Sequence, residues 1–404
     1  MTGFRQALGE IAEQGPPVGG MAERAIARAR RRRLGLFAAP GATVTAALVS
    51  VIVLVANGVL SGGGEREGTM RLGATQTVTS MGRTPEPLPA RGVPAVMMAY
   101  TVTCPGAGPR WQACSQWRLV TTDMRQFRVD DAIAPEVRDG SLEHQGALAV
   151  AADGRRVAYF RSDGRFVIRD LARGGVESPF AVKRADLREV TAHIAWSPDG
   201  RRLSVSFDPA DDDRPTTLAA RLVDLKTMAT VTLPLHCCVL GLPAGDAPIP
   251  MYDAYATEVG RGSLLLVGDD GAVRRRLPIG EIERSSVFSR HPGNTAVAAD
   301  GTRLAALLWP DRPPDDRGHH VYVPELTTFD VARGAMTRRH ALPRFQQVMG
   351  EAELLGWRDA ATVLVGMRYE RRGVYRVNAD TGETHQVVGL TAQPERLSVA
   401  YGLL

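Results

Sequence analysis

The four cysteines of this 404-residue chain are the residues whose chemistry is simplest to state, because two thiols that meet can form a disulfide. Cys104 and Cys114 flank a loop rich in glycine and proline, and a bond between them would close about 10 residues. Cys237 and Cys238 are adjacent, so they would form a strained vicinal disulfide, remain free, or pair with the first two. Since four cysteines allow three pairings, we predict the bond between Cys104 and Cys114 and leave the other two open.

Carboxylates gather in two further stretches, and such groups are common ligands of metal ions. Four aspartates lie between 208 and 213, and three lie between 311 and 316, just before His319 and His320. Both stretches stand beside prolines in long loops, a setting typical of solvated polar segments. The sequence has neither a Gly-x-Ser-x-Gly motif nor a glycine-rich phosphate loop that opens a helix. We therefore predict no catalytic, metal-ligating or cofactor-binding residue.

A repeated turn predicts the framework that would position these residues. Asp-Gly pairs recur along the chain, each between an apolar stretch and a stretch in which apolar residues alternate. Alternation with a period of two indicates a half-buried strand, and Asp-Gly provides the positive φ of a tight hairpin. The turns that we predict from this pattern are Asp153 and Gly154, Asp199 and Gly200, and Asp300 and Gly301.

A second marker accompanies the first. An Asp or Asn ends a later strand of the unit and a Gly follows four residues on, as at Asp170, Asp330 and Asn378. Units of four strands, spaced by roughly 45 to 60 residues, are typical of the blades of a β-propeller. The sequence predicts an all-β propeller of about six blades over residues 93–404, or seven if residues 75–79 or the last strand complete a split blade.

Residues 196–200, Trp-Ser-Pro-Asp-Gly, resemble the phrase that recurs in TolB-like and WD-repeat-like propellers of bacteria. The resemblance extends over roughly residues 93–404 and implies a fold more than an activity. It implies that Trp196 packs between blades and that Pro198, Asp199 and Gly200 set the turn. The Gly-His pair followed by Trp-Asp, typical of eukaryotic WD scaffolds, is absent from the sequence.

A membrane anchor is predicted before the propeller. Residues 34–60 carry no charge and follow five arginines between 28 and 33. About 20 apolar residues cross a bilayer as a helix, and positive charge beside the first span stays cytoplasmic. We predict a short helical cytoplasmic tail over 1–33, one transmembrane helix over 34–60, a flexible linker over 61–92 and an extracytoplasmic domain over 93–404. A buried core helix or a cleaved signal peptide are the alternatives.

The formal net charge of +5 is concentrated in the tail, where seven arginines accompany three glutamates in residues 1–33. The predicted exterior region is therefore near neutral, which argues against nucleic acid as a partner. All four cysteines lie beyond residue 60, on the side where disulfides persist. Lysine occurs only at Lys183 and Lys226, a bias typical of GC-rich, actinobacterial-type genomes.

The Arg-ended tail resembles those of actinobacterial membrane proteins found near sigma-factor genes. That resemblance implies a transmembrane regulator as one alternative function. A zinc-type anti-sigma domain needs a His and a Cys-x-x-Cys pair, and neither residue occurs before Cys104.

These patterns favour a membrane-anchored, non-catalytic propeller that binds a protein, a peptide or a cell-wall component. The rival hypothesis is a hydrolase or lyase with a metal site in the central channel, which would need carboxylates and histidines converging at strand starts. For the binding module, the predicted anchors are Trp111 in the cysteine-flanked loop, Trp309 at the edge of its own long loop, and Arg317.

Overall fold

The part of the chain that the computed structural model describes comprises residues 76–78, 85–103, 115–134, 136–138, 141–144, 146–209, 216–236, 238–253, 263–278, 294–309, 323–345, 352–368, 372–391 and 397–404. The chain divides into two compact units, Met1–Arg66 and Glu67–Leu404, and every described residue belongs to the second. The predicted tail and transmembrane segment lie outside these ranges. Within them, no helix is both long and apolar enough to span a bilayer.

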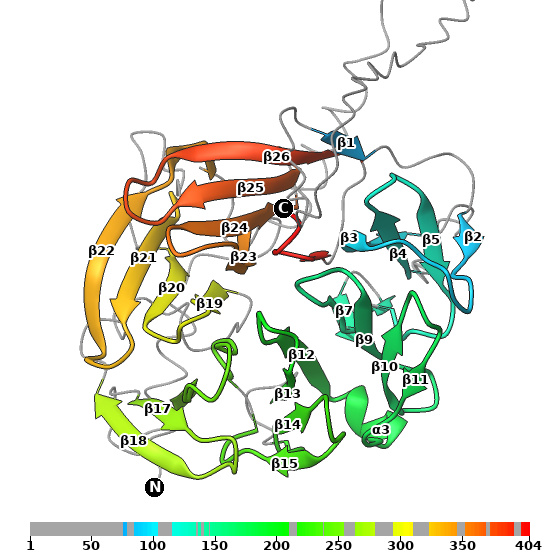
Figure 1. Ribbon diagram of the computed structural model, residues 1–404, viewed down its shortest axis with the longest axis horizontal. Coiled ribbons are helices and arrows are strands. Elements are labelled where there is room, and N and C mark those ends of the chain that lie inside the picture. Colours follow the sequence, from blue (N-terminus) through cyan, green and yellow to red (C-terminus); the bar gives the residue numbers. More distant parts are fainter. Residues whose placement is uncertain are drawn as a thin grey trace, which may run out of the picture. The chain divides into compact units, whose positions relative to one another are not determined.

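Six β-sheets are arranged around a central axis, as in a propeller with six blades (Figure 1). Each is numbered here as a blade in ring order, and its strands are given from the axis outward. Blade 1 contains β27 (Leu397–Val399), β3 (Val96–Thr103), β4 (Ser115–Thr121), β5 (Gln126–Val129) and β2 (Glu86–Pro87). Blade 2 contains β8 (Leu148–Val150), β9 (Arg156–Phe160), β10 (Phe166–Asp170) and β11 (Val176–Glu177). Blade 3 contains β12 (Val190–Trp196), β13 (Arg202–Pro209), β14 (Arg221–Asp224) and β15 (Thr230–Thr232).

The remaining three blades complete the ring. Blade 4 contains β16 (Ile249–Asp253), β17 (Ser263–Val267) and β18 (Val273–Pro278), and residues 238–242 hold its inner position through a bridge from Val239 to Met251. Blade 5 contains β19 (Thr295–Val297), β20 (Arg303–Leu308), β21 (Glu325–Asp330) and β22 (Ala335–Ala341). Blade 6 contains β23 (Ala352–Trp357), β24 (Thr362–Met367), β25 (Gly373–Asn378), β26 (Thr384–Leu390) and β1 (Gln76–Val78).

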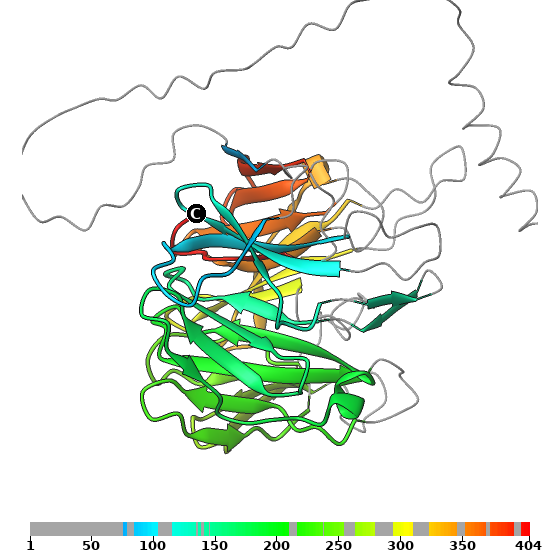
Figure 2. The ribbon, with the colours of Figure 1, turned by 90° about the vertical axis from the view of Figure 1, so that its right-hand side faces the viewer.

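Short elements fill the connections between blades. The hairpin of β6 (Glu136–Arg138) and β7 (Ser141–His144) precedes blade 2, α3 (Arg184–Leu187) precedes blade 3, and the 3-10 turn η3 (Pro343–Phe345) precedes blade 6. Figure 2, which views the ring from its side, shows the hairpin and α3 toward the same side. We call this side, where each inner strand begins, the loop face. The opposite side, which carries the turns at residues 153–154, 199–200 and 300–301, is the turn face.

The ring is closed by strands from the two ends of the described chain. The last strand, β27, pairs antiparallel with β3, so it supplies the inner strand of blade 1. The early strand β1 instead pairs in parallel with β26, on the outside of blade 6. The split blade predicted as a possible seventh is thus one of the six.

The core lies between neighbouring blades, where alternate residues of each strand face one another. One cluster joins Phe160 and Phe166 of blade 2 to Leu203 and Phe207 of blade 3, and Trp196 packs within it with 5% of its surface exposed. Every interface between blades is built this way because a strand in a stack of sheets buries both of its faces.

The Asp-Gly turns have the conformation that the sequence predicts for a tight hairpin. Gly154, Gly200 and Gly301 have φ values of 70°, 65° and 72°, in the left-handed region that glycine tolerates. In each turn the aspartate accepts a hydrogen bond from the backbone N–H two residues later, at 3.0 to 3.1 Å. The degenerate copy in blade 6 keeps this bond through Asp359 although it lacks the glycine.

An arginine stands three positions after Asp153, Asp199 and Asp300, and its side chain reaches the next blade. Two of these guanidinium groups also lie over the ring of a tryptophan that ends an inner strand, at 5.3 and 5.0 Å. The hydrogen bonds to backbone carbonyls are Arg156 to Gly200 at 2.7 Å, Arg202 to Pro243 at 2.7 Å, and Arg303 to Ala360 at 2.9 Å.

Tyr159 on β9 makes the free energy of unfolding depend on pH in the alkaline range. Its side chain is buried and its hydroxyl donates to Asp131 at 3.1 Å; burial and the Asp131 charge raise the pKa of Tyr159 from 10.0 to about 12. Since the folded-state pKa exceeds the unfolded value, this stabilisation is complete below pH 10 and is lost as pH rises toward 12. We expect the free energy of unfolding to fall by on the order of 2–3 kcal/mol across this window, measured by urea denaturation. Tyr159→Phe should remove this component, and an unchanged pH profile would contradict the assignment.

Candidate functional site

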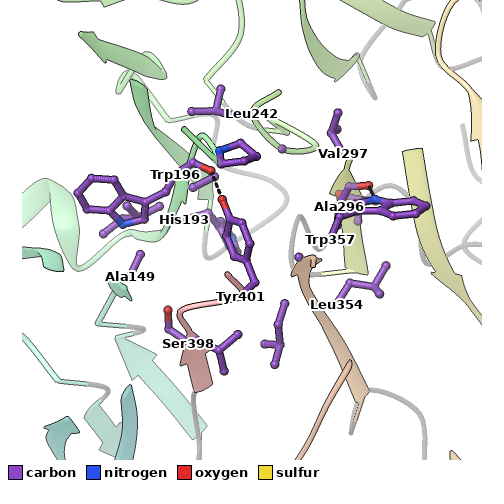
Figure 3. A pocket seen from close by; sticks show the side chains of 18 of the residues that line it. Ala149, His193, Trp196, Leu242, Ala296, Val297, Leu354, Trp357, Ser398 and Tyr401 are labelled. Carbon is purple, nitrogen blue, oxygen red and sulfur yellow. Dashed lines mark hydrogen bonds between the residues drawn. The ribbon is translucent and has the colours of Figure 1, made fainter. Parts of the chain in front are cut away.

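A central channel runs along the axis and is lined by the inner strands of all six blades. Toward the turn face it forms a cavity of about 170 Å³, and toward the loop face one of about 160 Å³. Small and apolar residues such as Ala149, Ala296, Val297 and Leu354 make up most of the wall (Figure 3). The polar residues on this wall therefore decide what the channel can do.

Tyr401 crosses the turn-face half of the channel. Figure 3 shows its ring inside the cavity, with the hydroxyl directed at the Trp196 carbonyl, to which it donates at 3.1 Å. The ring also packs against Gly356, where a Cβ atom would lie only 2.9 Å from it. Burial first, and then the charges of Asp199 and Asp153, raise the pKa of Tyr401, so the phenol stays neutral. One side chain from beyond β27 thus connects blades 1, 3 and 6 at this end.

Other polar groups on the wall tie neighbouring blades together. The Thr295 hydroxyl donates to the Leu240 carbonyl at 3.1 Å, and the Ser398 hydroxyl accepts the N–H of Val150 at 3.0 Å. The Trp357 indole N–H donates to the Ala296 carbonyl at 2.9 Å. Each of these bonds satisfies a backbone group inside the channel, so we assign them to structure.

The loop-face half of the channel is lined by two titratable side chains, Glu353 of β23 and His193 of β12, and His193 also lines the turn-face half. They come from blades 3 and 6, which occupy opposite positions in the ring of six. Asp208, at the end of β13, places its Oδ2 atom 3.4 Å from Nε2 of His193, within ion-pair range but without the alignment of a hydrogen bond. The Oε1 atom of Glu353 is inaccessible to solvent and has no hydrogen-bond partner.

A metal ion would need several such side chains to converge on one point. Within the described ranges, no three His, Cys, Asp or Glu side chains are grouped so that they could hold a metal ion. The 208–213 stretch contributes Asp208 to the described structure, whereas 210–215 and 310–322 lie outside it.

The predicted site residues are placed as follows. Cys238 is 4% exposed and disulfide-bonded, with its partner outside the described ranges. The cysteines Cys104, Cys114 and Cys237 and the proposed anchors Trp111 and Arg317 also lie outside them, so the predicted 104–114 bond stays a prediction.

Trp309 differs from its predicted role. It is 2% exposed and packs between blades 5 and 6, in a cluster with Leu326 and Phe345. The alternation of β20 explains the placement, because Trp309 falls on the same face as the buried Ala305 and Leu307. Trp309 is therefore a core residue and not an exposed anchor.

His193 and Glu353 were not among the residues predicted from sequence. The available signal was an ionisable residue inside an otherwise apolar first strand, in Thr-Ala-His-Ile-Ala-Trp and in Ala-Glu-Leu-Leu. Such residues are costly to bury without partners, so they mark places where a chain faces a channel or a ligand.

Comparison with known proteins does not assign a family. No family model matches the chain. A stretch of 125 residues is 34% identical to the phenylalanine–tRNA ligase beta subunit of Pseudomonas fluorescens, covering 28% of this chain. The chain spans only 15% of the length of that relative.

Several solved structures are similar at low sequence identity. An oligogalacturonate lyase in complex with manganese is 12% identical, with a TM-score of 0.36 over 68% of this chain and 71% of that one. The oligogalacturonate lyase of Vibrio parahaemolyticus is 11% identical, with a TM-score of 0.35 over 74% and 81%. A chain of the mitotic checkpoint complex is 13% identical, with a TM-score of 0.34 over 64% and 67%. The sheet order of this chain, and not these likenesses, defines its fold.

Proposed function

We propose that the chain is a non-catalytic binding module in which a ligand enters the central channel from the loop face. The observation that carries the proposal is the asymmetry of the channel. Tyr401 occupies the turn-face half, whereas Glu353 lines only the loop-face half, where its Oε1 atom and the Nε2 atom of His193 have no hydrogen-bond partner. A concave pocket in which a small number of polar groups fix the orientation of the ligand is the usual form of a ligand site.

The setting that we propose is extracytoplasmic, with the propeller tethered to the membrane by residues 34–60 and the tail of residues 1–33 in the cytoplasm. The uncharged stretch and the preceding arginines support this topology. The disulfide at Cys238 is also in keeping with an oxidising compartment. The ligand would be a protein, a peptide or a wall component, held in part by Trp111 and Arg317.

A second candidate function is a hydrolase or lyase, and one observation favours it. His193 is backed by Asp208 at 3.4 Å, and a carboxylate beside an imidazole is the arrangement that orients a general base. Glu353 on the opposite blade could supply a second proton-transfer group. Conversion of a ligand into a product by the purified chain would establish this alternative.

The binding proposal predicts that Trp111→Ala weakens ligand capture without destabilising the fold. Protoplasts that carry the full chain would be incubated with an envelope extract, and the bound material measured by mass spectrometry. We expect capture to fall about tenfold with the melting temperature nearly unchanged, because interface anchors are few and dominant. Protease added outside intact protoplasts should abolish capture, which serves as the topology control. Full capture after protease, or a large loss of stability in the variant, would contradict the proposal.

A further inference from the structure

The side chains that line the loop-face cavity limit the chemical class of ligand that it can bind. Among its described lining residues, His193 and Glu353 are the ones that titrate, and the remainder are apolar, small or engaged in structural bonds. Trp117 is one such residue, since its indole N–H donates to the Ile133 carbonyl at 3.1 Å. The two titratable groups therefore set the charge that a ligand meets.

Glu353 is half-buried in the wall of the loop-face cavity, and one of its two carboxylate oxygens has no partner. Its Oε1 atom receives no hydrogen bond, and among the described residues no arginine, lysine or histidine forms an ion pair with it. A carboxylate accepts hydrogen bonds at both oxygens, and an oxygen shielded from solvent is stabilised when a donor reaches it. A ligand group that donates a hydrogen bond and carries positive charge would complement the Oε1 atom of Glu353.

The opposite wall leads to the same conclusion. His193 lines the cavity and Asp208 stands behind it, so the cluster contains two carboxylates and one imidazole. Its charge is negative when the imidazole is neutral and stays negative when it is protonated. An anionic ligand would be repelled, whereas a cation is attracted by the net negative charge of the cluster.

We infer that the loop-face half of the channel binds an organic cation, namely an ammonium or guanidinium group on an alkyl stem. The charged end would lie at Glu353, and the stem would run along Leu354, Leu355 and Leu397. A cavity of about 160 Å³ has room for about ten water-sized atoms, which suits one basic side chain of a peptide. This inference rests on the proposed binding function and names the chemical class of its ligand.

The test is calorimetric titration of the full chain in detergent with the N-acetyl methylamides of lysine and of norleucine, which differ in the terminal ammonium. We expect the lysine probe to bind about tenfold or more tightly than the norleucine probe. The arginine derivative distinguishes guanidinium from ammonium recognition. Glu353→Gln should remove the preference for the charged probes. Glu383→Gln, on the exposed turn of the same blade, is the matched control and should keep it.

The stability of Glu353→Gln provides a second readout that does not depend on the probe. Because no side chain of the described residues pairs with the Glu353 carboxylate, the variant should melt at the same temperature as the wild type or higher. A lower melting temperature would mean that the carboxylate is already satisfied in the free protein, which overturns the inference.

The possible failures can be separated. Equal affinity for the lysine and norleucine probes, or binding of neither, overturns the cation site. The binding module is still tested by the capture assay with Trp111→Ala. Conversion of a bound basic probe into a new product would keep the cation site and overturn the non-catalytic function.

Discussion

Removal of residues 397–404 should abolish cooperative folding of the propeller. This segment contains β27, the inner strand of blade 1, and its pairing with β3 is what closes the ring. Leu397, Val399 and Leu404 are at most 8% exposed, and burial of each large apolar side chain contributes about 1.5–3 kcal/mol. With Tyr401 included, the loss is on the order of 10 kcal/mol, comparable to the whole stability of a typical domain.

Further bonds from the same segment make its loss more costly. The Gly402 N–H donates to the Ala152 carbonyl at 3.1 Å, and Arg376 donates through Nε to the Leu404 carbonyl at 2.7 Å. These bonds join blade 1 to blades 2 and 6, so the deletion opens both neighbouring interfaces.

Thermal unfolding of the full and shortened chains, followed by circular dichroism, measures this effect. The shortened chain should show no cooperative transition. Tyr401→Phe is the control, because it keeps the ring and loses one hydrogen bond worth about 1 kcal/mol. A shortened chain that melts cooperatively within a few degrees of the full one would show that β27 does not close the ring.

The strands of the propeller could be predicted from the sequence because local chemistry determines them. The strands predicted to end at Asp170, Asp330 and Asn378 are β10, β21 and β25, and each ends at that residue. Period-two alternation and Asp-Gly turns are signals within a few residues of each other, so no knowledge of distant parts is needed.

The candidate site could not be predicted, because it depends on which strands lie opposite one another. His193 and Glu353 are 160 residues apart and share a cavity only because the ring has six blades. The blade count could not be predicted for the same reason. Only the pairing of residues 397–399 with residues 96–103 shows that these segments belong to one blade and not to two.

The contacts between blades were only partly visible in the sequence. An arginine follows each predicted turn at a fixed distance, as at Arg156, Arg202 and Arg303, but spacing alone does not say what it reaches. The structure shows that each one donates to a carbonyl of the next blade. The repeated sequence pattern therefore reflects both the turn itself and a hydrogen bond that recurs between neighbouring blades.

Gly154→Val should destabilise the propeller by about 3–6 kcal/mol, because two penalties combine at this position. Its φ of 70° is strained for any β-branched residue. A Cβ atom there would also lie 2.3 Å from the backbone oxygen of Val96, which belongs to β3 of the neighbouring blade. That oxygen cannot rotate away, and the Val96 N–H is itself held by the Gly154 carbonyl at 2.8 Å.

Gly245→Val isolates the first penalty from the second. Gly245 has a similar φ of 60°, but a Cβ atom there meets nothing within 4 Å. The control should therefore lose only the backbone strain, about 1–3 kcal/mol. Urea denaturation of both variants measures the difference, which reports the steric contact between blades 1 and 2. Equal losses in the two variants would mean that the turn at Gly154 moves freely from β3, contrary to the close packing of these blades.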